Sequence, residues 1–166
     1  MQAKEFMTSG NAVRKVRVTG TISEVAAQMR EHKVSAVPVV NEGNHVVGIV
    51  SERDLLQKCG RECTEQGFGT MGAPLDWMSQ EFATHPPQDF SNIIKTYGSI
   101  GGTRVDEIMT KKVVTAGEDA EVMDLLITMA ERQINHIPIV DSEGRLTGIV
   151  ARGDVITALG RRQTAT

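Results

Sequence analysis

Aromatic residues are scarce in this sequence, at 4% of 166 residues, so Val, Ile, Leu and Met must fill a folded interior. Long apolar runs are missing as well, and none approaches the roughly 20 residues that span a bilayer. The opening residues, MQAKEFMTSG, lack the apolar centre of a signal peptide. We therefore expect a cytoplasmic protein without a membrane segment.

The sequence also lacks an excess of positive charge. Its 18 Lys and Arg residues face 21 Asp and Glu residues, for a formal net charge of −3. Nucleic-acid-binding domains usually carry a basic field, so this balance argues against nucleic acid as the main partner. A local basic patch would still be enough to bind a phosphate group.

Recognisable catalytic and metal-binding motifs are absent too. Cys59 and Cys63 are the only cysteines, and their spacing differs from the C-x-x-C of redox and zinc sites, which indicates ordinary reduced thiols. The four histidines are scattered without metal-ligand spacing. No nucleophile elbow, Walker A loop or dinucleotide fingerprint is found. We predict no enzymatic activity, no required cofactor and no metal site.

The strongest feature that the sequence does contain is a repeat. Residues 37–54 read VPVVNEGNHVVGIVSERD and residues 137–154 read IPIVDSEGRLTGIVARGD, one hundred positions later and without a gap. A unit of roughly 50 residues buries too little surface to be stable alone. Two such units can pack their sheets into one core, so the repeat predicts a pair of similar units.

The first unit predicts the order strand, helix, strand, strand, helix. Thr21 and Glu24 have the S/T-x-x-E form of a capping box, followed by apolar residues at helical spacing. Asn41-Glu42-Gly43-Asn44 has the composition of a hairpin turn. We expect these elements over residues 16–18, 21–32, 36–40 and 46–50, and from Ser51 onward.

The second unit predicts the same order. The β-branched run Val113-Val114-Thr115 is the expected first strand, and Asp119 is the expected cap of the helix that follows. The hairpin strands are expected over residues 137–140 and 146–150, and the closing helix begins over residues 154–159.

Each unit resembles a CBS domain, and the chain resembles a tandem CBS pair, or Bateman module. The resemblance is carried by Met7-Thr8 and Met109-Thr110, by the V-P-V-V and I-P-I-V strands, and by two G-I-V-x-x-x-D endings. It implies an α/β (α+β) fold in which two β-α-β-β-α units pack as a pseudo-two-fold pair with a helical insert between them. We expect the first unit over 1–58, the insert over 59–102, the second unit over 103–160 and a tail over 161–166.

The resemblance also implies a ligand-sensing module rather than an enzyme. CBS pairs commonly bind AMP, ADP, ATP or S-adenosylmethionine in clefts between the units, and they often dimerise into a flat disc. We therefore expect a small-molecule nucleotide as regulatory ligand, an unknown protein target in trans, and a homodimer. The dimer would use the helices after the hairpins, through Leu55, Leu56, Val155, Ile156 and Leu159.

The first unit fits the ligand-binding pattern of the family in full, with Ser51 and Asp54 at the end of the hairpin. An ionised Asp accepts two hydrogen bonds and can hold both hydroxyls of a ribose. Ser51 can donate to a sugar or phosphate oxygen, and a helix start favours anions. Ser51-x-x-Asp54 is equally a capping box, and the two roles are compatible.

The second unit keeps Asp154 but has Ala151 in place of the hydroxyl, so we expect unequal clefts, with tighter binding beside Asp54. In the family, a basic residue two positions before the strand proline often reaches phosphate, and His136 stands there in the second unit. Arg53 and Arg152 can add charge nearby. The alternatives are a surface strand position for His136 and solvated helix charges for the two arginines.

The expected insert is rich in aromatic residues. Phe90, Ile93, Ile94 and Tyr97 follow one face of a helix. The segment is either an ordinary helical excursion or a partner-binding element, a dimerising element or a lid.

Two functional hypotheses remain from the sequence, a nucleotide sensor and a structural dimerisation module without a ligand. Retention of both Asp54 and Asp154 favours the sensor. An enzyme with its chemistry in the insert is disfavoured, because the insert lacks clustered polar residues.

Overall fold

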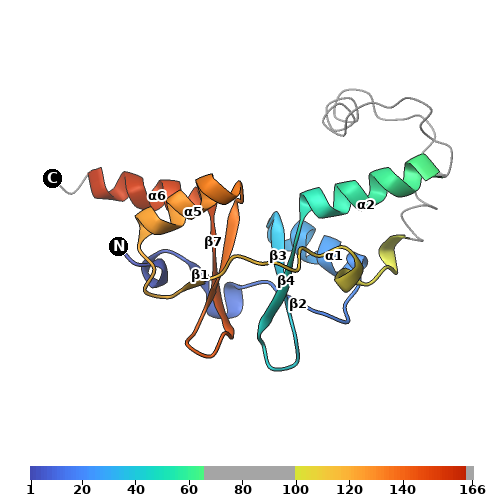
Figure 1. Ribbon diagram of the computed structural model, residues 1–166, viewed down its shortest axis with the longest axis horizontal. Helices are drawn as coiled ribbons and strands as arrows, with labels where there is room; N and C mark the ends of the chain where they lie inside the picture. The colour runs from blue at the N-terminus through green and yellow to red at the C-terminus, as the bar shows by residue number, and fades with distance from the viewer. Residues whose placement is uncertain (66–99, 164–166) are drawn as a thin grey trace.

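Two similar units lie side by side in the computed structural model, which describes residues 1–65 and 100–163 (Figure 1). The first unit has a sheet of order β2-β3-β4, and the second a sheet of order β1-β7-β6-β5. The first is built from β2 (Val16–Arg17), α1 (Ile22–His32), β3 (Ala36–Val40), β4 (Val46–Ser51) and α2 (Glu52–Glu65). The second is built from β1 (Thr8–Ser9), β5 (Ala116–Gly117), α5 (Val122–Arg132), β6 (His136–Val140), β7 (Leu146–Ala151) and α6 (Arg152–Gln163).

The two hairpins have the same register, as the repeat predicts. In the first, Ala36 lies opposite Ser51; in the second, His136 lies opposite Ala151. Both ladders shift register one residue before the inner strand ends, between residues 39 and 40 and between residues 139 and 140. The turns use residues with positive φ, Asn44 at 64° and Gly144 at 80°, which Asn and Gly tolerate best.

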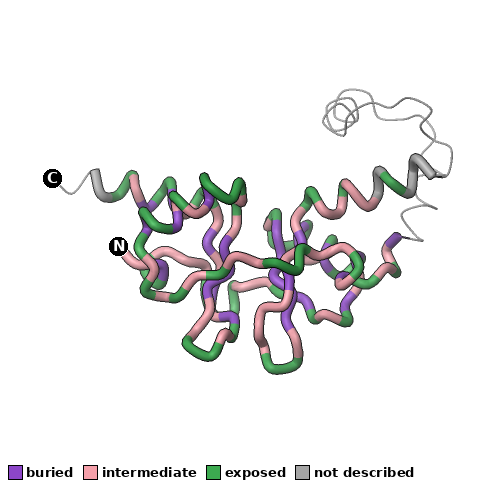
Figure 2. Tube along the Cα trace, in the orientation of Figure 1, coloured by how far each residue is buried: buried purple, intermediate pink, exposed green. Residues whose placement is uncertain are grey.

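Each unit has its own apolar core between sheet and helices, drawn as buried segments in Figure 2, in place of the one shared core that the repeat predicted. The inner strand of each hairpin supplies its centre, with β3 buried along its whole length. Helix α1 adds Val25 and Met29 at a spacing of four, and α5 adds Leu125 and Met129 at the same spacing. These positions lie on one helix face, so the aliphatic side chains fill the interior that aromatics do not.

The segment before each unit packs on the other unit. Ala3 is buried in the core of the second unit, its N–H donates to the Ala120 carbonyl at 2.8 Å, and β1 pairs antiparallel with β7. In the same way Val105 is buried in the core of the first unit, and Thr110 forms a bridge with Ile49 on β4. The two units are thus joined by an exchange of their leading segments.

Two expectations for the second unit are wrong. The first strand is β5 at Ala116–Gly117, parallel to β6, and not the β-branched run 113–115. Pairing with a buried strand overrides the weak strand preference of Ala and Gly. The N-cap of α5 is Glu121, without a side-chain capping bond, while Asp119 pairs with Lys4 at 2.6 Å.

The capping prediction for the first unit is confirmed in part. The Thr21 side chain accepts a hydrogen bond from the Glu24 N–H at 3.4 Å at the start of α1. The short 3₁₀ helices η1 (Ala3–Glu5), η2 (Gly10–Ala12) and η3 (Val105–Glu107) were not predicted.

Helix α2 runs to Glu65, seven residues beyond the expected end of the first unit. Residues 66–99, which hold most of the predicted insert and its helical stripe, lie outside the described residues.

Candidate functional site

The first half of the candidate site is the junction of β4 and α2. Ser51 ends the strand and precedes the helix, and its backbone N–H and hydroxyl donate to Asp54 Oδ2 at 2.7 and 2.8 Å. The carboxylate therefore accepts from the backbone at the helix start, which is one half of the predicted capping box; the Ser51 hydroxyl donates to Asp54 and is not the acceptor that a capping box requires. Both bonds end on one oxygen, so the second oxygen of Asp54 keeps its acceptor capacity for a further donor.

The second half is the junction of β7 and α6. The Ala151 N–H donates to Asp154 Oδ2 at 2.8 Å, in the same geometry as in the first unit. The hydroxyl donor is missing, because residue 151 is Ala. Both aspartates are partly buried, and each is held at a helix start by a backbone amide.

In each unit a small residue and a polar residue face each other across the hairpin, and the two residue types stand on opposite strands in the two units. Paired residues on antiparallel strands project to the same face of a sheet. Ser51 therefore shares its face with the small Ala36, and the small Ala151 shares its face with His136. The first unit carries its polar group at the helix start, and the second carries it on the inner strand.

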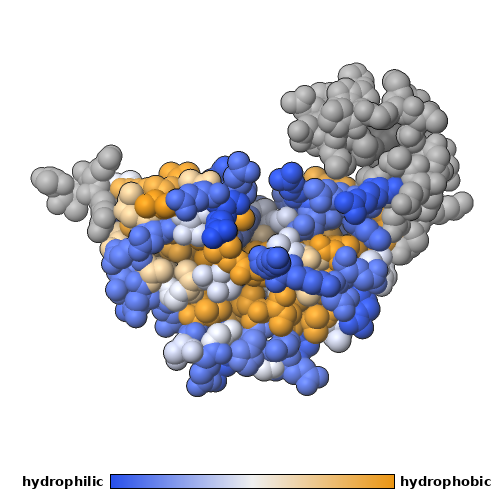
Figure 3. Space-filling view, viewed as in Figure 1, coloured by the Kyte–Doolittle hydropathy of each residue, from blue (hydrophilic) through white to orange (hydrophobic). Residues whose placement is uncertain are grey.

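His136 also joins the two units. Its Nε2 lies 3.0 Å from the hydroxyl of Ser35, which immediately precedes β3 of the first unit. Ser35 was missed in the sequence; the signal available was its position at the start of the inner strand, matched by the polar Asn135 in the repeat. Figure 3 shows a notch where the two units meet, with hydrophilic side chains on both sides.

The backbone ties the same residues to the helix starts. The Glu52 N–H, the first in α2, donates to the Ser35 carbonyl at 3.0 Å. The Arg152 N–H, the first in α6, donates to the Asn135 carbonyl at 2.8 Å. Each inner strand thus starts beside the helix that carries the aspartate of its own unit.

Burial holds the pKa of His136 below its ordinary value of 6.5. The negative charge of Asp154 opposes this shift, and the positive charge of Arg152 adds to it. Arg53 and Arg152 are both exposed on the first turn of their helices. His136 itself is partly exposed on its strand.

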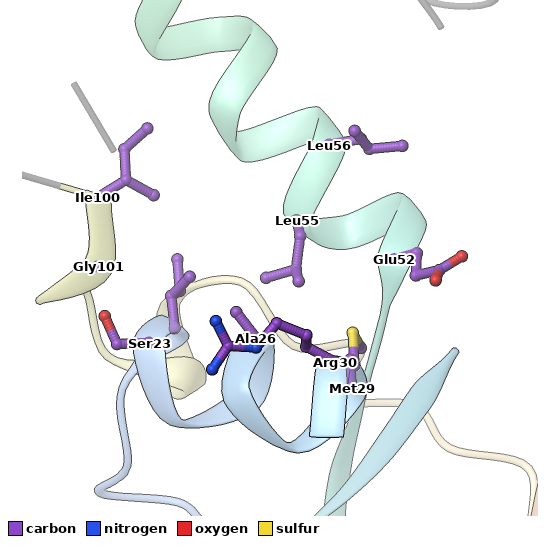
Figure 4. A pocket seen from close by; sticks show the side chains of 10 residues that line it. Ser23, Ala26, Met29, Arg30, Glu52, Leu55, Leu56, Ile100 and Gly101 are labelled. Carbon is purple, nitrogen blue, oxygen red and sulfur yellow. The ribbon is translucent and has the colours of Figure 1, made fainter. Parts of the chain in front are cut away.

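A hollow lies elsewhere, between α1 and α2 of the first unit (Figure 4). It measures about 490 Å³ and has an apolar floor, with Arg30 and Glu52 as its charged groups. Its apolar lining is Ile22, Ala26, Met29, Leu55, Leu56 and Ile100. Sequence reasoning did not find this hollow, because it forms only when the two helices pack.

Clusters of metal ligands and membrane-spanning helices are both absent from the described part of the chain. Residues 1–65 and 100–163 contain no group of three or more His, Cys, Asp or Glu side chains placed to hold a metal ion. Among the helices of these residues, none combines the length and apolarity needed to cross a bilayer.

Comparison with known proteins decides the family. The CBS domain model matches residues 3–60 and 105–161. The chain belongs to the CBS domain family. The two matches cover most of the chain and correspond to the two units of the fold, so this protein is a tandem CBS pair.

Relatives of this CBS pair include proteins from archaea and plants. Protein MJ1426 of Methanocaldococcus jannaschii is 33% identical over 141 residues, which cover 82% of this chain and 79% of that protein. The chloroplastic CBS domain-containing protein CBSX1 of Arabidopsis thaliana is 28% identical over 93% of this chain, and the match spans only 62% of that protein.

Solved structures show the same fold. CBSX2, crystallised in complex with AMP, superposes with a TM-score of 0.68 at 23% identity, covering 98% of both chains. The CBS pair of protein MJ0100, crystallised with 5-methylthioadenosine and S-adenosyl-L-methionine, superposes with a TM-score of 0.66 at 22% identity, covering 98% of both chains.

Proposed function

We propose that this CBS pair is a sensor that binds an adenine nucleotide, or the related S-adenosylmethionine, between its two units. The observation that carries the proposal is the pair of aspartates, each held at a helix start at equivalent positions of the two units. An oxygen that is not used in capping is available to a ribose. The CBS pairs of similar fold that were crystallised with AMP and with S-adenosyl-L-methionine support this ligand class.

The remaining site residues have complementary roles in this proposal. Asp54 and Asp154 hold ribose hydroxyls, and Ser51 adds a donor in the first cleft. His136 and Arg152 contact phosphate or another anionic group in the second cleft, and Arg53 does so in the first. Cations at these positions are suited to phosphate because charge-assisted hydrogen bonds are stronger than neutral ones.

The sensor is proposed to act without catalysing a reaction, as a homodimer that changes its contacts with another protein chain.

Of the five side chains expected on the dimer face, three are used inside the units: Val155 is buried in the second core, and Leu55 and Leu159 pack against the two cores. Leu56 and Ile156, which are equivalent in the repeat, remain 55% and 60% exposed. The apolar face is therefore narrower than the sequence predicts.

A structural dimerisation module without a ligand is the second candidate. The capping bonds of Asp54 and Asp154 favour it, because they explain both carboxylates without a nucleotide. The exposed Leu56 and Ile156 fit either candidate, so ligand binding is the property that separates them.

A thermal-shift screen with AMP, ADP, ATP, NAD and S-adenosylmethionine tests the proposal directly. A ligand at 100 times its dissociation constant stabilises the folded state by about 2.7 kcal/mol. An increase in melting temperature with an adenosyl compound supports the sensor. If none of the five compounds changes the melting temperature at millimolar concentration, the structural dimerisation module is the function that stands.

Asp54→Asn and Asp154→Asn then test the assigned residues by calorimetry. The amide oxygen can keep the capping bond, while the acceptor for ribose is lost, so affinity at one cleft should fall by about 1.5–3 kcal/mol. The control is Asp124→Asn, an exposed carboxylate in the first turn of α5, which should leave affinity unchanged. Unchanged affinity in both test variants would limit the two aspartates to capping.

A further inference from the structure

The contact between Ser35 and His136 links the two halves of the candidate site. Ser35 belongs to the first unit and His136 to the second, and 3.0 Å separate the hydroxyl oxygen from Nε2. Each residue sits at the start of an inner strand, next to the helix that carries one of the aspartates. This hydrogen bond therefore runs between the two clefts.

His136 can make this contact because of the Ser-to-Ala difference between the repeats. Ala151 lies opposite His136 on β7 and leaves room on the shared face for an imidazole. In the first unit the corresponding pair is Ala36 and Ser51, whose hydroxyl is taken by Asp54. The polar group of the second unit is thus free of its own aspartate and directed across the junction.

A hydrogen bond of this kind limits what each residue offers to a ligand. While Ser35 occupies Nε2, the imidazole has only Nδ1 for another partner. A ligand oxygen that takes the Nε2 proton must displace Ser35, and a ligand oxygen that accepts the Ser35 hydroxyl proton removes the donor from Nε2. The bond has to be broken only once, by whichever ligand binds first.

We propose that the Ser35–His136 hydrogen bond is a latch that makes the two clefts bind ligand cooperatively. This inference rests on the proposed function. The first ligand binds at the cost of the latch, and the second binds to a protein in which the latch is already open. One neutral hydrogen bond corresponds to about a two- to twelve-fold difference in affinity, so the second ligand should bind tighter by that factor.

The latch itself is tested without ligand. Long-range ¹H–¹⁵N spectra of the His136 imidazole should show an Nε2 signal shifted by the hydrogen bond to Ser35 in the parent protein, whichever of the two atoms carries the shared proton. In Ser35→Ala the Nε2 signal should move, because that nitrogen loses its partner, while Ser35→Thr, which keeps the hydroxyl, should retain the parent pattern. Identical spectra for the parent and Ser35→Ala would overturn the latch.

The coupling is tested by calorimetric titration of the full chain with AMP and, separately, with ATP and S-adenosylmethionine. The parent and Ser35→Thr should show tighter second binding. In Ser35→Ala the first binding should be tighter by about two- to twelve-fold and the cooperativity should vanish. The control is Ser142→Ala, an exposed serine at the tip of the other hairpin, which should behave as the parent.

The outcomes separate this inference from the proposed function. Two binding events with equal cooperativity in the parent and Ser35→Ala would overturn the latch and leave the sensor intact. No binding of any of the three compounds to any variant would overturn both.

Discussion

Single residues explain why the two copies of the repeat are not interchangeable. Ser51 and Ala151 differ by one hydroxyl, and Ala36 and His136 differ in the opposite direction on the facing strand. Each facing pair combines one small and one polar side chain. The polar side chain lies on β4 in the first unit, as Ser51, and on β6 in the second unit, as His136. The sequence alone shows the difference between Ser51 and Ala151. Only the strand pairing in the structure shows that the difference between Ala36 and His136 lies directly opposite it.

His136 should give the protein a pH-dependent stability. Its pKa is lowered in the folded state by burial, so the unfolded state binds more protons at mildly acidic pH. The stability associated with the neutral imidazole is complete above the ordinary pKa of 6.5 and is lost as pH falls toward the lowered folded value. His136→Gln should flatten this slope in urea titrations at a series of pH values.

The control for the histidine is His32→Gln, an exposed residue at the end of α1, which should leave the slope as it is in the parent. An unchanged slope in His136→Gln would mean that burial does not lower the pKa of this histidine.

Gly148 should not tolerate a side chain. A Cβ atom there would collide with Met7 Sδ and lie 3.0 Å from the Thr8 carbonyl oxygen of the paired strand β1. We expect Gly148→Ala to lower the free energy of unfolding by about 1–3 kcal/mol, measured by denaturant titration. Gly160→Ala, with open space around its Cβ in α6, should instead stabilise by about 0.5–1 kcal/mol. Equal effects would show that Met7 moves aside freely.

At the scale of elements, the leading segments are the least expected feature of the fold. The residues before each unit contribute to the other unit's sheet and core, with Met7 over Gly148 and Met109 over Gly48. The Met-Thr pairs quoted for the resemblance are therefore packing residues of the opposite unit. From its position in the sequence, each Met-Thr pair was expected to pack in the unit that it precedes.

Ala3→Asp tests this exchange of segments. Ala3 is fully buried in the second core, where an unpaired carboxylate has no solvation, so the loss should be about 3 kcal/mol or more. Hydrogen exchange should show lost protection in β6 and β7 of the second unit before β3 of the first. Asn11→Asp, exposed in the same leading segment, serves as control and should stay within about 0.5 kcal/mol of the parent. Protection lost first in β3 would contradict the exchange.

At the scale of the whole molecule, the described α-helices carry large apolar side chains that the two units leave uncovered. Leu56 on α2 and Ile156 on α6 are joined by Met123 and Ile127 on α5 as exposed large apolar residues. The hollow between α1 and α2 adds further apolar surface on the first unit. Exposed apolar surface of this kind is typical of an interaction face.

Leu56→Lys combined with Ile156→Lys should abolish the proposed homodimer. Light scattering at micromolar concentration should give the mass of two chains for the parent and of one chain for the double variant, because two lysines per chain would be desolvated at the interface. Glu42→Lys, at an exposed hairpin tip, is the control for added charge and should remain dimeric. A parent protein with the mass of one chain would remove the dimer from the proposed function.

The sequence by itself determined the duplicated architecture, the two hairpins and the aspartates at the helix starts. These features depend on local chemistry that recurs at an offset of one hundred residues: a turn with residues that accept positive φ, a buried β-branched strand and a capping carboxylate. The pairing of His136 with Ala151 and of Ala36 with Ser51 was not predicted, and the strand register of the structure shows it.

Only the tertiary structure decided the position of β5, the exchange of leading segments and the contact between Ser35 and His136. Strand β5 has little intrinsic strand preference and forms because a buried partner satisfies its backbone hydrogen bonds. The exchanged segments and the contact between the units join residues far apart in the sequence, such as Thr110 with Ile49, Ala3 with Ala120 and Ser35 with His136. Such contacts depend on which surfaces meet when two cores pack, and no local pattern in the chain encodes that choice.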